Sequence, residues 1–487
     1  MMNGIPKVVV IGAGVVGTLI ARELTKYNIS VTLIDKEEDA GWGVTKANSA
    51  ILHGGYDDPV DSVRGRFAAK GNQQYTQLSE ELGFEVKRIG SYVLAFEDED
   101  IPHLEELMEK AQANGVTGCE IHSHEEIVKR NPNINPSVKA GFWCPSAGIT
   151  EPWMVAISAV ENAVLNGMVF RPGEQVQAIE LEESDQGKTV KGVRTDKAYY
   201  SCDFVINAAG LYADKIAQMA GAYCPVLHPR KGEYILLDKK LGAIITNILF
   251  PVPTKDSKGV LVLPTVDGGI LLGPTAKDMD VDQKEDTTTS AEGLAEVRQK
   301  TNAMVTGLDF SQTVKIFAGL RPEDSQKDFV IGTTEVYGFI NAAAMRSPGL
   351  TAAPAIAVHI VEKVLKEELG LELEKRDDFN PVLAPYPTLP EDDPQVWEQM
   401  VQKDPRFGKV VCVCNKITEA QIVEAIRRGA RTIDGVKFRT RAGFGRCQGG
   451  FCLARIAEIL ARELDKPLNE IKYRTGNTKL LSGRVRA

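Results

Sequence analysis

Residues 7–35 change their pattern of apolar and polar positions twice. An almost wholly apolar run, "KVVVIGAG", precedes "VVGTLIARELTKYN", in which apolar positions recur at helical spacing, and then comes the apolar "ISVTLID". Continuously apolar strands are buried on both faces, as in a parallel sheet. The pattern therefore predicts a strand, a tight turn, a helix and a second strand, which together form a βαβ unit.

Later segments predict a different kind of sheet. Residues 88–96, "RIGSYVLAF", and 232–238, "GEYILLD", have the pattern of antiparallel strands, and residues 261–275 that of a hairpin closed by Asp267, Gly268 and Gly269. Because these strands interrupt the α/β segments, they indicate a second domain built from insertions into the first.

Composition limits the classes of protein that the chain can represent. At 487 residues it is too long for one core, and its formal net charge of -9 argues against a nucleic-acid-binding protein. Residues 377–409 are rich in Pro and Asp and are predicted to form an extended, partly docked linker. Without an apolar run of 18 residues or a signal-peptide pattern, we expect a cytoplasmic chain with no transmembrane segment.

A glycine pattern lies between the first predicted strand and helix. Gly12 permits a tight turn, Gly14 lets the backbone approach a pyrophosphate, and Gly17 lets the helix pack closely on the strand. Asp35, followed by Lys36, ends the second strand, where a carboxylate accepts hydrogen bonds from a ribose. A glycine turn without a ligand is the alternative, but the strand, helix and acid in register favour a dinucleotide site.

A second segment suits the same site. Residues 199–221 contain the strand "FVINAAG", whose small residues Ala209 and Gly210 would let the backbone pass a bound cofactor. Tight packing within the sheet is the other interpretation. No second G-x-G-x-x-G follows a strand, so one dinucleotide is expected, and these residues leave NAD and FAD open.

Six stretches in order carry a resemblance that decides between these cofactors. They are "VVVIGAGVVG", "ANSAILHGGY", "INAAG", "PRKGEYILLD", "GLRP" and "SPGLTAAPAIA". In them, residues 1 to about 370 resemble the FAD-dependent D-amino-acid-oxidase-like superfamily, and within it the branch of glycerol-3-phosphate dehydrogenase and L-2-hydroxyglutarate oxidase. The implied fold class is α/β and α+β, with a Rossmann-like FAD domain and an inserted antiparallel-sheet substrate domain. The expected boundaries are 1–84, 146–224 and 320–370 for the FAD domain, 85–145 and 225–319 for the substrate domain, and 371–408 for the linker.

The resemblance also implies positions along the FAD. Asn48 and Ser49 would lie beside it and Val176 near the adenine. A helix N-terminus at Gly349, Leu350 and Thr351 would close over the isoalloxazine, where its dipole would stabilise negative charge on the reduced flavin.

Oxidation of an alcohol by a flavin needs a base for the hydroxyl proton and an anchor for the substrate. We predict that His53 is the base or a positive neighbour of the flavin, with a structural histidine as the alternative. Arg321 is the predicted anchor, because guanidinium binds carboxylate or phosphate through two parallel hydrogen bonds, although it could form a structural ion pair. Lys231 and Arg346 are weaker candidates, and Arg346 facing the pocket would indicate a substrate with more than one negative charge.

Four of the eight cysteines gather near the C-terminus. Cys412 and Cys414 form one close pair and Cys447 and Cys452 another, a set that suits either zinc or an iron–sulfur cluster, with free thiols as the remaining interpretation. The segment between them predicts a capped helix with Ile422 on its apolar face. This region is similar to the bacterioferritin-associated-ferredoxin-like [2Fe-2S] domain, which also forms the C-terminal part of the anaerobic glycerol-3-phosphate dehydrogenase large subunit. That resemblance implies a [2Fe-2S] cluster on the four cysteines, within a domain expected at 409–487.

Basic residues are frequent around these cysteines. They are Arg427, Arg428, Arg431, Lys437, Arg439, Arg441 and Arg446. One interpretation is a solvated face. The other is a surface that balances the negative charge of the cluster and docks an acidic electron-accepting protein or subunit. Together the resemblances imply an FAD-dependent dehydrogenase that oxidises sn-glycerol 3-phosphate to dihydroxyacetone phosphate and passes electrons through FAD and the cluster to a partner. An L-2-hydroxy acid and an amino acid are alternative substrates. A non-catalytic electron-transfer subunit is the rival from another class.

Overall fold

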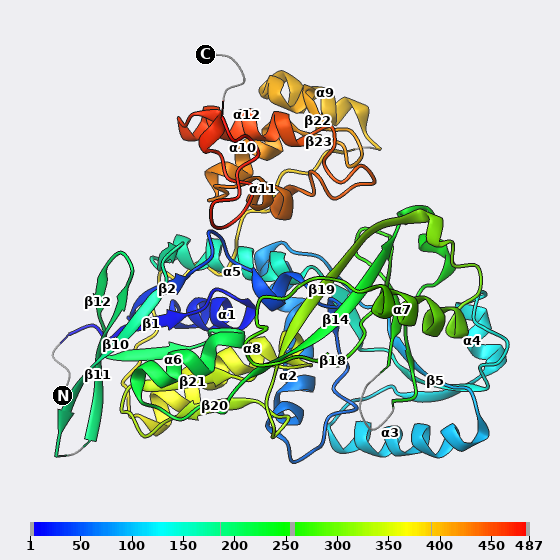
Figure 1. The fold of residues 1–487 in the computed structure, drawn as a ribbon, viewed down its shortest axis with the longest axis horizontal. Helices are drawn as coiled ribbons and strands as arrows, with labels where there is room; N and C mark the ends of the chain where they lie inside the picture. Colours follow the sequence, from blue (N-terminus) through cyan, green and yellow to red (C-terminus); the bar gives the residue numbers. More distant parts are fainter. Residues whose placement is uncertain (1–3, 186, 254–258, 391, 484–487) are drawn as a thin grey trace.

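The computed structural model describes residues 4–185, 187–253, 259–390 and 392–483. In Figure 1 a mainly parallel sheet with its helices lies on the left, an antiparallel sheet on the right, and a small helical C-terminal domain above them. The predicted combination of α/β and α+β parts is confirmed.

The parallel sheet has six strands in the described residues and contains the predicted βαβ unit. Strand β1 pairs in parallel with β2 on one side and β13 on the other, and its four apolar residues are buried. Helices α1, α2, α5 and α8 pack against one another beside this sheet. The strand order is β20 (Val330–Thr333), β21 (Phe339–Ala343), β13 (Phe204–Asn207), β1 (Lys7–Ile11), β2 (Ser30–Asp35), β9 (Val169–Pro172), and the helices are α1 (Val15–Leu24), α2 (Val63–Leu82), α5 (Pro152–Leu165), α8 (Gly349–His359) with a π-helical continuation (Ile360–Glu368), and α6 (Ala213–Ala220).

The second sheet holds the strands predicted as antiparallel, and all its pairs are antiparallel except that of Ser91–Ala95 with Ile248–Pro251, which is parallel. The predicted hairpin is β16 (Leu261–Pro264) with β17 (Ile270–Gly273), in which Leu263 lies opposite Leu271. Long strand β14 (His228–Leu237) pairs with β19 (Thr313–Glu323), which carries the "GLRP" stretch. The remaining strands are β5 (Ser91–Ala95), β6 (Glu120–Ser123), β7 (Ala140–Cys144), β15 (Ile248–Pro251) and β18 (Lys277–Asp278), and the helices beside the sheet are α3 (Ile101–Ala113), α4 (His124–Arg130) and α7 (Ala291–Met304).

Two small sheets complete the N-terminal part. One is β10 (Val176–Ser184), β11 (Gly187–Thr195) and β12 (Tyr199–Ser201), and the other is β3 (Ile51–Leu52), β8 (Gly148–Thr150) and β4 (Val86–Lys87). Within the residues that the structure covers, no helix is sufficiently long and apolar to cross a lipid bilayer.

The C-terminal domain is built around the predicted capped helix. Thr418 and Gln421 form a capping box at the start of α10 (Glu419–Arg427), and Ile422, Val423 and Ile426 face the core. The other elements are β22 (Val410–Cys412), β23 (Ile417–Thr418), α11 (Ile433–Thr440) and α12 (Leu453–Leu464).

The segment between the two parts runs back over the N-terminal part. Asn162 Nδ2 donates to the carbonyl of Asn380 at 3.1 Å, and the Tyr386 hydroxyl donates to Glu161 at 2.6 Å. This segment also contains a helix that its composition did not predict, α9 (Pro394–Lys403), whose first N–H groups are capped by Asp393. The linker is thus partly docked, as predicted, and the short helix is the feature that the prediction lacked.

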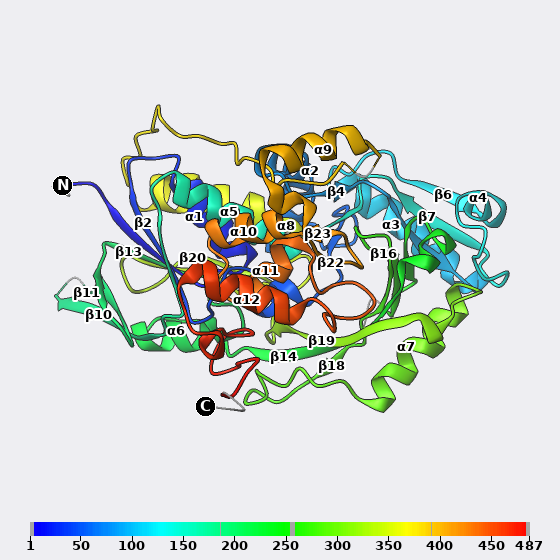
Figure 2. The same ribbon diagram turned by 90° about the horizontal axis from the view of Figure 1, so that it is seen from above.

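A buried ion-pair network joins the C-terminal domain to the N-terminal part. Arg439 of α11 donates to Asp39 at 2.9 Å and to Glu161 of α5 at 3.1 Å, and all three side chains are at most 6% exposed. Arg441 pairs with Glu151 beside them. Figure 2, seen from above, shows the C-terminal domain lying over the N-terminal part, where α11 contacts α5.

Replacing Arg439 by Met should destabilise the docked domain by about 3–5 kcal/mol, because Asp39 would stay buried without its cation and Glu161 would keep only the more distant Arg428, at 3.9 Å. Urea unfolding of the FAD-loaded protein measures this loss. Arg462→Met is the matched control, since that side chain is 52% exposed and its ion pairs contribute about 1 kcal/mol or less. Equal losses in the two variants would contradict the role assigned to the network.

Candidate functional site

The turn after β1 leaves no room for side chains at two of its glycines. Gly12 has φ +107°, and a Cβ on it would lie 2.3 Å from the Ala208 carbonyl oxygen. A Cβ on Gly17 would lie 1.9 Å from the Gly12 carbonyl oxygen, so α1 packs directly on the turn. Gly14 caps α1 without a side chain, which keeps the helix N-terminus open to a phosphate.

Asp35 is held by this turn at the end of β2. Its carboxylate accepts hydrogen bonds from the backbone N–H of Ala13 at 2.6 Å and of Glu37 at 2.8 Å. Burial raises the pKa of Asp35 to about 6, although both hydrogen bonds act to lower it. A ribose hydroxyl donating to this carboxylate would favour its charged form.

A cavity of about 1850 Å³ begins at this turn and joins the residues predicted to touch the cofactor. It is lined by Gly12, Gly14, Asp35, Lys36, Asn48, Ser49, Val176, Ala209 and Gly210, whereas Gly17 packs α1 behind it. Lys36 lies 4.0 Å from the centre of the Tyr212 ring. A crowded glycine turn, an open helix N-terminus and a ribose-binding acid are the features that an FAD diphosphate and adenosine require. The residues present therefore fit FAD.

A second cavity of about 220 Å³ adjoins the first and holds the predicted reaction site. His53 Nε2 lies 3.3 Å from Ser347 Oγ, and the His53 backbone N–H donates to Thr351 Oγ1 at 2.9 Å. Gly349, Leu350 and Thr351, at the start of α8, line the same cavity. The structure thus brings the histidine and this helix N-terminus together.

Three arginines line the second cavity. Arg321 donates to the Thr275 carbonyl oxygen at 2.8 Å, and within the described residues it has no ion pair with a carboxylate. Arg346 lies 3.2 Å from Glu323, and burial lowers its pKa. Arg230 is bound to Asp278 at 2.8 Å. Arg321 is therefore the guanidinium with the most binding capacity left for an anionic substrate.

Lys231 is not among the residues that line this cavity. Its ammonium is buried and forms an ion pair with Asp286 at 2.9 Å. In β14 the neighbouring Arg230 faces the cavity, and side chains alternate between the two faces of a strand, so Lys231 points away. An ion pair within the fold accounts for this lysine, in place of the predicted contact to the substrate.

The four C-terminal cysteines approach one another as two pairs. Cys414 Sγ lies 3.6 Å from Cys447 Sγ, and the buried Cys452 interacts with the buried Cys412. Burial acts to raise the pKa of Cys447, but backbone N–H groups of the glycine-rich loop and the Cys414 thiol bring it below its usual value. In the described part of the chain no three potential ligands converge on a single ion. Two thiol pairs fit the two irons of a [2Fe-2S] cluster better than one zinc ion.

Most of the surrounding basic residues do not form a solvated face. Arg439 and Arg441 pair with acids of the N-terminal part, Arg428 binds Glu424 and two linker carbonyls, and Arg431 donates to helix carbonyls. Arg427, Arg431 and Arg446 remain exposed. The prediction of a seven-residue docking surface is thus wrong in extent, because the domain interface uses part of that charge.

Comparison with known proteins identifies the family. The model of FAD-dependent oxidoreductases matches residues 7–363. The chain belongs to this family. A second model, the BFD-like [2Fe-2S] binding domain, matches residues 410–462 and includes all four cysteines. The chain is therefore an FAD-dependent oxidoreductase with FAD and a [2Fe-2S] cluster as cofactors, and the two predicted resemblances are confirmed.

Relatives of this oxidoreductase act on glycerol 3-phosphate. It is 43% identical over 480 residues to the glycerol 3-phosphate dehydrogenase of Caloramator mitchellensis, with 98% of each chain covered. The glycerol 3-phosphate oxidase of Mycoplasma pneumoniae is 30% identical over 77% of this chain and 97% of its own. The solved structure of L-alpha-glycerophosphate oxidase from M. pneumoniae with FAD bound superposes with a TM-score of 0.72 at 28% identity, covering 79% of this chain and 100% of that one.

Sequence reasoning missed three residues of the site in this oxidoreductase. Thr45 Oγ1 accepts the N–H of Val15 at 3.0 Å and so holds the start of α1. Tyr234 and Arg230 line the second cavity. Thr45 precedes the quoted "ANSAILHGGY" by two positions, and Arg230 lies within "PRKGEYILLD", where the alternation of strand side chains could have favoured it over Lys231.

Proposed function

We propose that this oxidoreductase oxidises sn-glycerol 3-phosphate to dihydroxyacetone phosphate and delivers the electrons through its C-terminal domain to a partner protein. The observation that carries the proposal is Arg321, a guanidinium without a carboxylate partner among the described residues, in the cavity that also holds His53 and the start of α8. The dehydrogenase relative covering 98% of the chain supports the substrate.

The side chains of the second cavity suit a secondary alcohol bearing a phosphate. Arg321 would bind the phosphate through charge-assisted hydrogen bonds, whereas Arg230 and Arg346 are already paired with Asp278 and Glu323. His53 would take the hydroxyl proton at Nε2 while the carbon loses a hydride, which leaves a ketone. Bound FAD supplies the hydride acceptor, and a [2Fe-2S] cluster carries electrons one at a time.

Anaerobic titration tests the substrate and the direction of electron flow. Glycerol 3-phosphate, 2-hydroxyglutarate and several amino acids would each be added to the loaded protein while flavin and cluster absorbance are followed. We expect glycerol 3-phosphate to bleach the flavin and then the cluster. A flavin that stays oxidised with glycerol 3-phosphate would refute the substrate, and bleaching of the flavin alone would refute transfer to the cluster.

Replacing His53 by Gln should lower kcat for glycerol 3-phosphate by about 10²–10⁴-fold with a much smaller change in KM, because general-base catalysis contributes about that factor. Stopped-flow measurement of flavin reduction isolates this step. His124→Gln is the control, since that ring binds a backbone carbonyl beside α4 outside both cavities. A variant reduced at the normal rate would leave His53 with a structural role.

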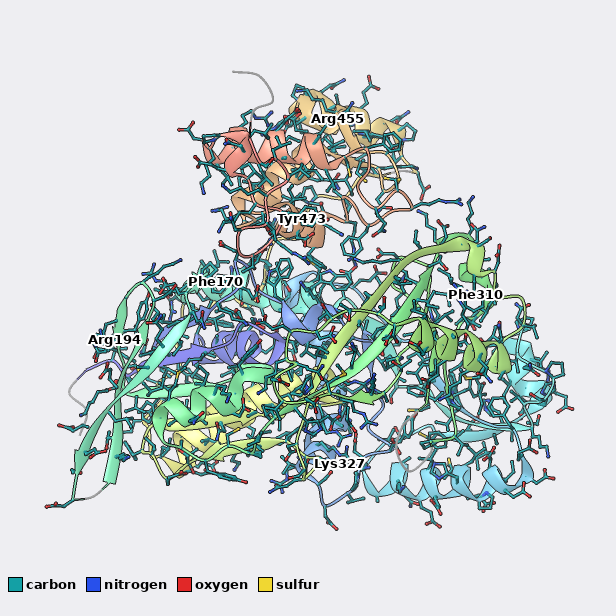
Figure 3. All side chains as sticks on the ribbon, viewed as in Figure 1. Phe170, Arg194, Phe310, Lys327, Arg455 and Tyr473 are labelled. Atoms are coloured by element: carbon teal, nitrogen blue, oxygen red, sulfur yellow. The ribbon has the colours of Figure 1, made fainter. Side chains whose placement is uncertain are left out.

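The surface beside the cysteines suits an electron-accepting partner. Val413 and Phe451 are 75% and 84% exposed, and each directly precedes a cysteine. The exposed Arg446 and Arg455 lie close to Cys447 and Cys452 in the sequence. Figure 3 shows Arg455 on the side of the domain that faces away from the N-terminal part. An apolar contact with basic residues around it fits an acidic protein surface.

We expect the second-order rate constant for reduction of an acidic ferredoxin-type acceptor to fall at least about tenfold between 20 mM and 500 mM salt, because steering by exposed charges is screened. Stopped-flow mixing of the pre-reduced protein with acceptor measures this constant. The salt dependence should weaken in Arg446→Gln and remain in Arg194→Gln, which lies on the exposed β11 far from the C-terminal domain. A rate indifferent to salt would contradict basic docking.

A further inference from the structure

The large cavity extends well beyond the residues assigned to FAD. From Gly12 and Asp35 it continues over Trp42 and β19 to Cys414 of the C-terminal domain. Its volume of about 1850 Å³ exceeds the roughly 300–1,000 Å³ of ordinary small-molecule sites. We call the part between β19 and α11 the interdomain chamber; it is lined by Lys46, Lys315, Asp434, Lys437 and Arg474.

The chamber concentrates positive charge. Lys46 and Lys315 come from the N-terminal part, and Lys437 and Arg474 from the C-terminal domain. Within the described ranges, none of these four cations lies within 4.0 Å of a carboxylate oxygen. Asp434 acts on all three lysines and Glu37 acts on Lys46 as well, so two carboxylates face four cations.

Burial and repulsion between neighbouring cations act on the lysines, of which Lys437 is buried and Lys46 and Lys315 are half-buried, whereas Arg474 is exposed. Burial, together with Lys437 and Arg474, lowers the pKa of Lys315 to about 8, and burial lowers that of Lys46 to about 8 despite the attraction of Asp434. Lys437 is 6% exposed. Like charges that are partly withdrawn from water are stabilised by an opposite charge between them, so the chamber has the electrostatic properties of an anion site.

Aromatic side chains from both parts form another wall of the chamber. Trp42 and Phe438 meet edge to face with ring centres 5.5 Å apart, and Trp153 stacks on Phe444 at 5.6 Å. Lys46 Nζ lies 3.6 Å from the centre of the Trp42 ring, which brings the charge and the aromatic surface together. Such a wall suits a planar ring system.

We propose that the interdomain chamber binds a second phosphate-bearing molecule of the nucleotide class, in addition to FAD. Lys46, Lys315, Lys437 and Arg474 would hold its phosphate, and its ring would lie along the aromatic wall. The FAD diphosphate belongs instead at Gly14 and the N-terminus of α1. The inference does not depend on which substrate the second cavity takes.

The test uses the full-length, FAD-loaded protein. Equilibrium dialysis with ADP, FMN and inorganic pyrophosphate as probes measures affinity and stoichiometry. We expect at least one of the two nucleotides to bind one per chain beyond the resident FAD, and more tightly than pyrophosphate. Lys315→Met with Lys437→Met should weaken that binding by about 100-fold, roughly tenfold for each charge-assisted contact removed. Lys188→Met with Lys191→Met removes the same charge from the exposed β11 and should leave the affinity unchanged.

Several outcomes would overturn the proposal. One is an absence of saturable binding by both nucleotides, and others are equal affinity in the chamber variant and its control, or pyrophosphate binding as tightly as the nucleotides. Loss of FAD from the chamber variant would also overturn it, because that result would assign these cations to the FAD diphosphate. FAD content and flavin bleaching by substrate establish that the variant is folded. Lys315→Met alone, on the half-buried β19, provides a milder variant with an expected tenfold weakening.

Discussion

Replacing Arg321 by Met should reduce kcat/KM for glycerol 3-phosphate by about 100-fold or more, mainly through KM. The guanidinium lines the second cavity, and its Nη2 donates a hydrogen bond to one neutral carbonyl oxygen. Its remaining N–H donors are therefore available to an anion. Loss of two charge-assisted hydrogen bonds costs about 3–5 kcal/mol, and about 1.4 kcal/mol corresponds to a factor of ten. Steady-state kinetics with an artificial dye acceptor measure the change.

The other arginines of the cavity supply internal comparisons. Arg346→Met should have a smaller effect, because Glu323 neutralises Arg346 at 3.2 Å. Arg194→Met on the exposed β11 should leave kinetics unchanged. If KM for glycerol 3-phosphate stayed normal in Arg321→Met, the phosphate would have to bind elsewhere and the proposed orientation of the substrate would fail.

Replacing Cys447 by Ser should abolish transfer to a protein acceptor while leaving flavin reduction by substrate intact. Cys447 is one of the four proposed ligands and its Sγ lies 3.6 Å from Cys414 Sγ, so its loss would leave the cluster without a complete set of thiolates. Acceptor reduction should fall by at least about 100-fold, as expected when a required electron carrier is missing. Iron and sulfide analysis, flavin bleaching and acceptor kinetics on the same preparation distinguish these steps.

Cys224→Ser is the matched control, because this half-buried thiol lies in the N-terminal part, away from the C-terminal cysteines. It should keep its cluster and its rate of acceptor reduction. Rapid acceptor reduction by a cluster-free Cys447→Ser protein would mean that electrons leave directly from the flavin, and the proposed route would be wrong.

Local sequence patterns are sufficient to predict the dinucleotide-binding turn, but they are insufficient to predict which residues line the second cavity. The elements β1, α1 and β2 follow one another directly in the sequence. The spacing of the glycines and the periodicity of the apolar residues are therefore sufficient to predict this strand, turn, helix and strand. Arg230 and Arg321 lie directly opposite each other only because β14 pairs with β19, about 90 residues further along the chain. Composition does not encode that register, so it does not distinguish Arg230 from Lys231 as the residue that faces the cavity.

The basic residues near the cysteines illustrate a related limit. Their number is visible in the sequence, but their partners Asp39, Glu151 and Glu161 lie more than 250 residues away. Charge alone could not distinguish a surface for a partner from an interface within the same chain. The residues that remain exposed beside the cysteines, Arg446 and Phe451, become evident only after the domain is placed.

The docked linker has a consequence for how the two cofactor sites communicate. A flexible tether would let the C-terminal domain diffuse, and its encounter with the N-terminal part would be set by an effective concentration in the millimolar range. Here Asn380 and Tyr386 bind α5, and Arg439 fixes α11 to it. Electron transfer between the two sites would thus take place across a constant distance, without a preceding diffusional encounter of the two domains. The slow step in each catalytic cycle would then be the binding of the external acceptor.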